Sequence, residues 1–359
     1  MKKSKKNILQ HKPIFDQLDI DSVSNTIKNN WISEGPETKK FEENYRKFVG
    51  TKYAISTTSG TTAIFLGLIG AGIKPGDEII IPNMTFIATA SAVKLAGAKP
   101  ILAEVNERDF TISIDSIKKK VSKKTKGVIP VHLNGRSTDF DELIELAKKS
   151  NLKIIEDASQ GLGSKYKKKN HGSIGDVAAF SLAPTKIITT GQGGMITTNN
   201  FEIFDKIRKM KDQGREDKSE NYKMVGYNFK FTDLQASLGN SQFSKLKNKL
   251  NKLNELYELY SELLKNNKAI TIPPKRKETQ LWYFDILVKN RNKLQKYLNT
   301  NHIDSKSFHE PINTRTPYKT KEKFLISEKI CSSGLYLPSH ADLSSKDVEY
   351  ICQKINSFK

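Results

Sequence analysis

Short apolar runs bounded by turn residues recur along the first two hundred residues of the chain. They are rich in Ile and Val and apolar on both faces, which is typical of buried strands in a parallel sheet. Helical patterns at 61–69, 89–96 and 140–149 separate several of these runs. The alternation predicts an α/β domain built on a mixed, mainly parallel seven-stranded sheet. The predicted strands are 53–57, 78–82, 100–105, 127–133, 153–158, 177–182 and 194–198.

The pattern changes after Asp233, where apolar residues recur at spacings of four and three from Leu246 to Leu264. This spacing predicts one long helix packed along the domain, and the shortness of the repeat disfavours the alternative of a coiled coil. Beyond a break at 273–274, a strand pattern at 281–288 and later helical patterns predict a smaller C-terminal α/β domain. We therefore expect a large domain over 1–240 and the long helix with the small domain over 241–359. The later helices are predicted at 291–299 and 345–357.

The formal net charge of +21 comes mostly from Lys residues spread along the whole chain. Base readout and bidentate phosphate binding favour Arg, and the chain has neither zinc-finger spacing nor an aromatic and basic RNA-binding signature. A Lys-rich solvated surface therefore explains the charge better than nucleic-acid binding does. The charge is also compatible with a phosphorylated small molecule as a ligand.

The two cysteines, Cys331 and Cys352, provide neither a disulfide framework nor the spacing of a metal site. This usage predicts a reducing, cytoplasmic location and no bound metal. The uncharged stretch 54–73 is long enough to cross a membrane, but its many Ser, Thr and Gly residues favour a strand, a turn and a helix. The basic N-terminus lacks the apolar region of a secretory signal. No membrane insertion is expected.

A segment of small hydroxylated residues, Thr58 to Thr62, follows the first predicted strand and opens an apolar helix. The free backbone N–H groups and the positive end of a helix favour a phosphate group, and Gly60 permits close approach. The alternative is an ordinary Ser or Thr cap of the helix.

A carboxylate, Asp157, stands at the end of the apolar strand predicted at 153–158. Open α/β sheets bind ligands at this edge, and a buried Asp needs a cationic or donating partner. A protonated pyridine nitrogen would serve as that partner. The alternative is an Asp that caps the following turn.

One lysine, Lys186, follows a buried strand and a proline turn and precedes the glycine-rich turn 191–194. A Lys in such a cleft can have a lowered pKa and form a Schiff base, and Ser181 could reach the same phosphate as Gly60. The alternative is a loop lysine beside flexible glycines. Similarly, Phe86 follows the strand 78–82 and could stack on a planar cofactor, although a core Phe is the alternative. Together these residues supply the parts that pyridoxal phosphate (PLP) needs.

The order of these motifs resembles that of the DegT/DnrJ/EryC1/StrS aminotransferases, and the resemblance covers nearly the whole chain. It implies the aspartate-aminotransferase (type I PLP) fold and a homodimer with shared active sites. The matching segments are 31–36, 60–61, 82–89, 131–132, 156–158, 181–186, 226–235 and, more weakly, 337–338.

The resemblance also implies a role for each candidate residue. Lys186 would be the Schiff-base lysine, Asp157 the partner of the pyridine nitrogen, and Phe86 the stacking ring. Gln160 would lie near the ring hydroxyl, and Asn228 would reach the phosphate of the neighbouring subunit. The residues that would hold the phosphate within one subunit are Gly60, Thr61 and Ser181.

The implied reaction moves an amino group from glutamate to a nucleotide-linked keto-6-deoxy sugar, giving a 4-amino sugar for surface polysaccharides such as lipopolysaccharide. A 3-amino product, a PLP-dependent sugar dehydratase and a non-catalytic PLP-binding regulator remain alternatives. Dehydratase relatives carry His at the lysine position, so Lys186 favours amino transfer. The chain departs from the family at Gln192, where Glu is usual. Weaker matches suggest substrate contacts at Trp31, His309 and Tyr318.

Overall fold

The central sheet of the computed structural model, which describes residues 7–216 and 220–358, has the strand order β1–β9–β8–β5–β4–β2–β3. Within these residues it has seven strands, and β9 alone runs antiparallel to its neighbours β1 and β8. The prediction of a mixed, mainly parallel sheet is therefore confirmed. The strands are β1 (Tyr53–Thr57), β2 (Glu78–Pro82), β3 (Lys99–Ala103), β4 (Thr125–Val128), β5 (Lys153–Asp157), β8 (Val177–Ser181) and β9 (Gly194–Thr198).

Helices cover both faces of this sheet because successive strand residues point to opposite sides. Within β2, Ile79 and Ile81 join one buried cluster, whereas Ile80 joins another that includes Phe140. Both faces are therefore apolar, as the strand composition predicts. The helices of this part are α2 (Pro36–Val49), α3 (Gly60–Gly70), α4 (Ile87–Leu95), α5 (Ile114–Lys120), α6 (Phe140–Ser150) and α7 (Phe201–Lys211).

The fourth strand is shorter than the run 127–133 predicts, since β4 ends at Val128. Pro130 lacks the N–H group that would continue the ladder. Its carbonyl still accepts a hydrogen bond from Asp157 N at 3.0 Å, and Val131 forms an isolated bridge with Asp157. The strand predicted at 281–288 likewise begins only at Asp285.

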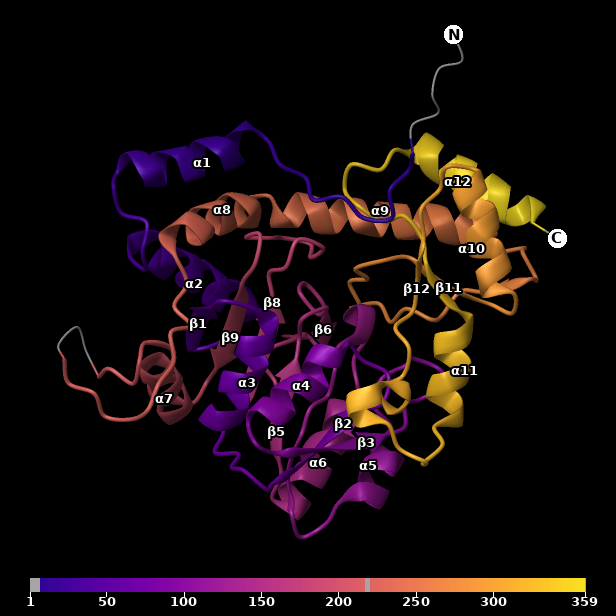
Figure 1. The fold of residues 1–359 in the computed structure, drawn as a ribbon. Coiled ribbons are helices and arrows are strands. Elements are labelled where there is room, and N and C mark those ends of the chain that lie inside the picture. Colours follow the sequence, from indigo (N-terminus) through magenta and orange to yellow (C-terminus); the bar gives the residue numbers. More distant parts are fainter. Residues whose placement is uncertain (1–6, 217–219, 359) are drawn as a thin grey trace.

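A long helix, α9 (Leu246–Leu264), confirms the helix expected from the apolar spacing. It follows α8 (Asp233–Ser244), and Figure 1 shows the two helices running nearly end to end above the large sheet. The far end of α9 packs against a small antiparallel sheet, β10–β11–β13–β12, and against α12. Other elements here are β10 (Ile270–Thr271), β11 (Asp285–Val288), α10 (Arg291–Thr300), β12 (Lys306–Ser307), α11 (Leu325–Ser333), β13 (Gly334–Tyr336) and α12 (Ser345–Ser357).

The N-terminal segment connects distant parts of the molecule. Ile8 forms a parallel bridge with Ile303, and Gln10 N donates to Asp304 Oδ2 at 3.2 Å. The chain then crosses α9 and reaches α1 (Gln17–Lys28), which lies beside α8 (Figure 1). The beginning of the described chain is therefore anchored on its C-terminal part.

A buried ion pair joins the two sheets. The guanidinium group of Arg136, which follows β4, donates to both carboxylate oxygens of Asp285, the first residue of β11, at 2.7 and 2.8 Å. Both side chains are 2% exposed. Burial acts to lower the pKa of Arg136, but the Asp285 carboxylate outweighs it and raises the pKa.

No helix in the described ranges combines the length and the apolar content that crossing a bilayer requires.

Candidate active site

A cavity of about 320 Å³ lies at the carboxyl ends of the central strands. Segments that follow β1, β2, β5 and β8 line it, at the edge where open α/β sheets bind ligands. The structure thus brings together side chains that lie far apart in the sequence. The predicted site residues that line this cavity are Gly60, Thr61, Phe86, Asp157, Gln160, Ser181 and Lys186.

The first turn of α3 forms one end of the cavity. Ser59 caps the helix by accepting a hydrogen bond from Thr62 N at 3.1 Å, while the Thr62 hydroxyl accepts from Ser59 N at 3.0 Å. The ordinary helix cap given as the alternative is therefore present. However, the N–H groups of Gly60 and Thr61 in this first turn have no partner within the helix. A Cβ on Gly60 would lie 2.8 Å from Ser181 Cβ, so this close approach requires glycine.

The carboxylate of Asp157 is held by two donors at the end of β5. Thr89 Oγ1 donates to Oδ2 at 2.7 Å, and Ser159 N donates to Oδ1 at 3.1 Å. The residue is only 5% exposed and lines the cavity. The contact with Ser159 N is the turn cap that was the alternative prediction for Asp157. The carboxylate nevertheless faces the space beside Lys186.

The side chain of Lys186 extends from the loop after β8, and its Nζ lies 3.8 Å from the centroid of the Trp282 ring. Burial of the amine lowers the pKa of Lys186 to about 7, against the opposing effect of Asp157, and Lys306 adds to the lowering. A large fraction of this amine is neutral at physiological pH, whereas an ordinary surface lysine is almost fully protonated. Lys186 is thus chemically different from a solvated loop lysine.

The ring of Phe86 belongs to the cavity and not to the core, because it is 50% exposed. Phe86 is the residue before α4, and its ring lies 5.2 Å from that of His309 with an angle of 55° between the planes. Burial lowers the pKa of His309 to about 4, so its imidazole is neutral near pH 7. The sequence suggests His309 as a substrate contact, and the structure places it at the cavity.

Trp282 and Lys306 line the cavity although the sequence did not single them out. Both come from the C-terminal part of the chain. Trp282 is fixed by Asn134, whose side-chain oxygen accepts from Trp282 N at 3.1 Å and from Tyr283 N at 2.8 Å. The backbone N–H of Asn134 in turn donates to Gln160 Oε1 at 2.8 Å, so one buried residue connects both sides of the cavity.

Three predicted residues are not among those that line this cavity: Asn228, Trp31 and Tyr318. Asn228 is exposed and forms a backbone bridge with Asp212. The Tyr318 hydroxyl lies 3.1 Å from Ser91 Oγ. Gln192 does line the cavity, and its carbonyl accepts from Gln235 Nε2 and Thr190 Oγ1, both at 2.7 Å. The roles of all the predicted site residues, these three included, stay predictions.

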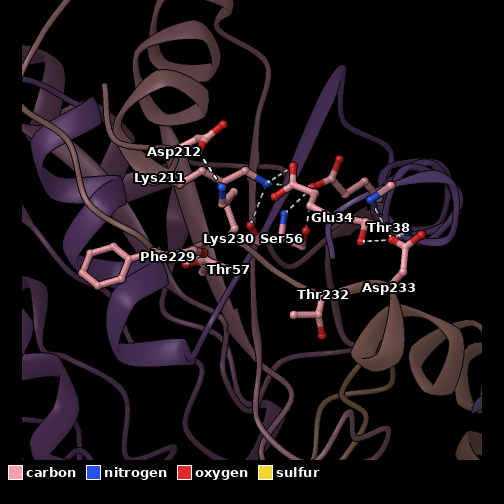
Figure 2. A network of polar contacts seen from close by, with 12 residues as sticks. Glu34, Thr38, Ser56, Thr57, Lys211, Asp212, Phe229, Lys230, Thr232 and Asp233 are labelled. Atoms are coloured by element: carbon pink, nitrogen blue, oxygen red, sulfur yellow. Dashed lines mark hydrogen bonds and ion pairs between the residues drawn. The ribbon is translucent and has the colours of Figure 1, made fainter. Parts of the chain in front are cut away.

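A buried polar network anchors the segment that carries Trp31. Lys211 Nζ lies 3.1 Å from Glu34 Oε1 and donates to the Ser56 carbonyl at 3.2 Å. Figure 2 shows these contacts. Burial acts to lower the pKa of Lys211, but the carboxylates of Glu42 and Glu34 outweigh it and raise the pKa. Trp31 itself is 54% exposed, so the network holds an aromatic side chain on the outside of the chain.

The cavity fits PLP in the size and chemistry of its ends. The glycine-dependent approach of α3 to Ser181 leaves room and N–H donors for a phosphate group. Asp157 could pair with a pyridinium nitrogen, and the exposed ring of Phe86 could cover a heteroaromatic face. Lys186 provides the amine that would bond the cofactor.

The sequence profile of the DegT/DnrJ/EryC1/StrS aminotransferase family matches residues 13–356. GDP-perosamine synthase from Escherichia coli O157:H7 is 32% identical over 98% of this chain and 99% of that protein. A dTDP-3-amino-3,6-dideoxy-alpha-D-galactopyranose transaminase from Aneurinibacillus thermoaerophilus is 33% identical over 95% of this chain and 96% of that protein.

Two solved structures show the same fold over nearly the full length. Helicobacter pylori PseC, an aminotransferase involved in pseudoaminic acid biosynthesis, superposes with a TM-score of 0.93 at 26% identity, covering 98% of both chains. The PLP form of Spr1654 from Streptococcus pneumoniae superposes with a TM-score of 0.93 at 25% identity, also covering 98% of both chains. These likenesses confirm the predicted fold class.

Proposed function

Because the chain belongs to the DegT/DnrJ/EryC1/StrS aminotransferase family, we propose that it transfers an amino group from glutamate to a nucleotide-linked keto-6-deoxy sugar, with PLP as the cofactor. The observation that carries this proposal is the meeting of an amine, a carboxylate and an exposed aromatic ring beside a helix N-terminus in one cavity. These groups come from four separate strand ends, so their convergence is a property of the whole fold.

Each lining residue has a distinct role in the proposed site. Lys186 bonds the cofactor, Asp157 pairs with its pyridine nitrogen, and Phe86 stacks on its ring. Gln160 lies near the ring hydroxyl. When bound, PLP supplies an electron sink for the carbon that loses its proton. The phosphate is held by Gly60, Thr61 and Ser181.

The proton chemistry falls to Lys186. When its amine is free, it can take a proton from the substrate carbon and return one, and a pKa near 7 suits both directions at neutral pH. The fixed carboxylate of Asp157 keeps the ring nitrogen protonated during this exchange. Neutral His309 and exposed Lys306, at the same cavity, leave its entrance favourable to an anionic substrate.

We propose a 4-amino sugar for surface polysaccharide synthesis as the product, which the likeness to GDP-perosamine synthase supports. The likeness to a 3-amino sugar transaminase, at almost the same identity, supports the 3-amino alternative. The direct test incubates the protein with glutamate and a panel of nucleotide-linked 3-keto and 4-keto sugars. Mass spectrometry and NMR of the product then identify the sugar and the aminated carbon, and no amination of any member would contradict the proposal.

We expect the purified protein to absorb visible light and to become irreversibly labelled on Lys186 when borohydride is added. The rate of cofactor attachment should rise with pH through a midpoint near 7, because only the neutral amine attacks and burial lowers the pKa of Lys186 to about 7. Peptide mapping identifies the labelled lysine, and Lys186→Ala is the control. A label on another lysine, or a midpoint near that of a free lysine, would refute this assignment.

The proposed homodimer shares its sites, with Asn228 of one subunit reaching the cofactor phosphate of the other. This sharing is compatible with the exposed position of Asn228 away from its own cavity. Mixing Lys186→Ala with an inactivating Asn228 variant should restore activity in about one quarter of all sites, because half of the randomly reassorted dimers are mixed and each contains one intact site. Activity is measured after subunit exchange has been verified. Subunit exchange without recovery of activity would contradict the shared-site proposal but would not affect the assignment of PLP as the cofactor.

We also propose a cytoplasmic location, which two free, buried cysteines, Cys331 and Cys352, support.

A further inference from the structure

Two side chains separate the active-site cavity from a second, smaller cavity. Lys186 and Trp282 line both the cavity of about 320 Å³ and one of about 30 Å³ behind it. The smaller cavity also contains His11, Lys249 and His340. Lys186 therefore lies between the two cavities. Its flexible side chain needs a contact that keeps the amine in the larger cavity, which Asp157 also lines.

Trp282 makes two contacts that could provide this restraint. Its ring lies 3.8 Å from Lys186 Nζ, and its Nε1–H donates to the carbonyl of Thr185, the neighbour of Lys186, at 2.8 Å. The indole is itself held in place, since it stacks on Tyr283 at 4.1 Å and its backbone N–H bonds to Asn134. One rigid residue thus contacts both the lysine amine and the lysine loop.

The contact between Lys186 and the indole ring depends on charge. The negative face of the ring attracts an ammonium group, and this attraction is larger where water is excluded. Trp provides the strongest such attraction among the aromatic side chains. The ring therefore favours the charged lysine, while a neutral amine is free to leave the ring.

We propose that Trp282 is a positioning residue that holds the Lys186 ammonium group over its indole ring while the lysine is not bonded to the cofactor. The inference rests on the proposed role of Lys186 in cofactor binding. Trp282 keeps the amine at the active-site cavity between the bond-forming steps, so that Lys186 returns to the cofactor from a defined position. Asp157 and Lys306 also influence the charge of Lys186. Lys186 in turn contributes to the lowered pKa values of His11 and His309.

The tryptophan content makes this contact directly measurable, because the chain has only two tryptophans, Trp31 and Trp282. In the full-length, cofactor-free Trp31→Phe protein, all tryptophan fluorescence comes from Trp282. Its intensity should change with a midpoint near pH 7, where the Lys186 ammonium loses its proton. Lys249 lines the smaller cavity together with Trp282, and burial lowers its pKa to about 8, so Lys249→Met is added to the Trp31→Phe background to remove this second titration. His11 and His309, whose pKa values burial lowers to about 4, titrate in a separate range.

The matched variants decide the origin of the transition. Lys186→Met and Lys186→Arg in the same Trp31→Phe background should both lose it, since neither side chain changes charge near pH 7. The Trp282→Phe protein, which retains Trp31 alone, should also lack it. Absence of the transition in the Trp31→Phe protein, or its persistence in Lys186→Met, would overturn the proposal.

A second measurement covers the possibility that a lysine variant folds poorly. Labelling of Lys186 by an amine-specific acylating reagent at pH 7, followed by mass spectrometry, should be roughly threefold to tenfold faster in Trp282→Leu than in the parent, as a lost cation–π contact predicts. Trp282→Phe, which keeps an aromatic face, should stay nearer the parent, and equal rates in all three proteins would contradict the proposal. Neither measurement uses the cofactor, so failure here is distinct from failure of the borohydride labelling.

Discussion

Replacing Asp157 with Asn is expected to slow amino transfer about 10²–10³-fold while PLP still binds, the scale found when a preorganised group that stabilises charge is removed. Asn has the shape of Asp, so the contacts of the side chain with Thr89 and Ser159 can be retained in large part. The amide carries no negative charge, however, and cannot keep the pyridine nitrogen protonated. The electron sink therefore weakens while the binding surface stays in place.

The measurement compares turnover with glutamate and the keto sugar, with cofactor binding followed by visible absorbance. Thr89→Val is the matched control, because it removes the 2.7 Å donor to Asp157 but keeps the carboxylate. We expect this control to lose roughly tenfold, the lower end of the range for one hydrogen bond to a charged group, because Ser159 N still donates to the carboxylate. Turnover of Asp157→Asn near that of the parent would remove Asp157 from the mechanism.

Replacing Asp285 with Asn is expected to lower the free energy of unfolding by about 3–5 kcal/mol, because it leaves the charge of Arg136 buried without its partner. Both carboxylate oxygens of Asp285 accept from Arg136, and the two side chains are 2% exposed. The pair joins the large sheet to the small one, so its loss weakens the contact that places Trp282 at the active site. Urea denaturation measures the effect.

Two further variants show whether burial is the cause. The double variant Arg136→Met/Asp285→Leu should recover most of the lost stability, because it removes both charges and keeps apolar volume. Glu107→Gln breaks an exposed ion pair, in which the side chains of Glu107 and Lys329 are 62% and 73% exposed. This substitution should lower the free energy of unfolding by less than about 1 kcal/mol. Equal losses for Asp285→Asn and Glu107→Gln would contradict the expected importance of burial.

The central strands could be predicted because their own residues determine them. The bounds of β1, β2 and β9 coincide with the apolar runs, which end at turn residues. The extension of the fourth strand past Val128 was wrong, since Pro130 interrupts the ladder. Helix α8 was missed because it buries polar residues such as Asp233, Ser237 and Gln242, so that it lacks a continuous apolar stripe.

Some residues of the candidate site could likewise be predicted from local sequence, and others could not. Gly60, Asp157 and Lys186 each lie within a few residues of a strand end, where local sequence already suggests a ligand site. Trp282 carries no such local signal, because it reaches the cavity only through the packing of the C-terminal part and the buried amide of Asn134. A residue placed by tertiary contacts of this kind could not be predicted from spacing along the chain.

The N-terminal segment is anchored on residues that the ribosome makes much later, so it cannot take its final position until most of the chain has been synthesised. Gln10 bonds to Asp304, 294 residues later, and His11 Nε2 lies 3.1 Å from the carbonyl of Pro184 in the loop that carries Lys186. At typical synthesis rates of 5–20 residues per second, the segment waits roughly 15–60 s for its C-terminal partner to be made. The seven-stranded sheet can assemble during this interval, since its last strand ends at Thr198. The N-terminal segment beside the lysine loop is therefore fixed in place only near the end of translation. A nascent chain stalled earlier would carry the strands of the active site without the contacts that join residues 8–10 to residues 303–304.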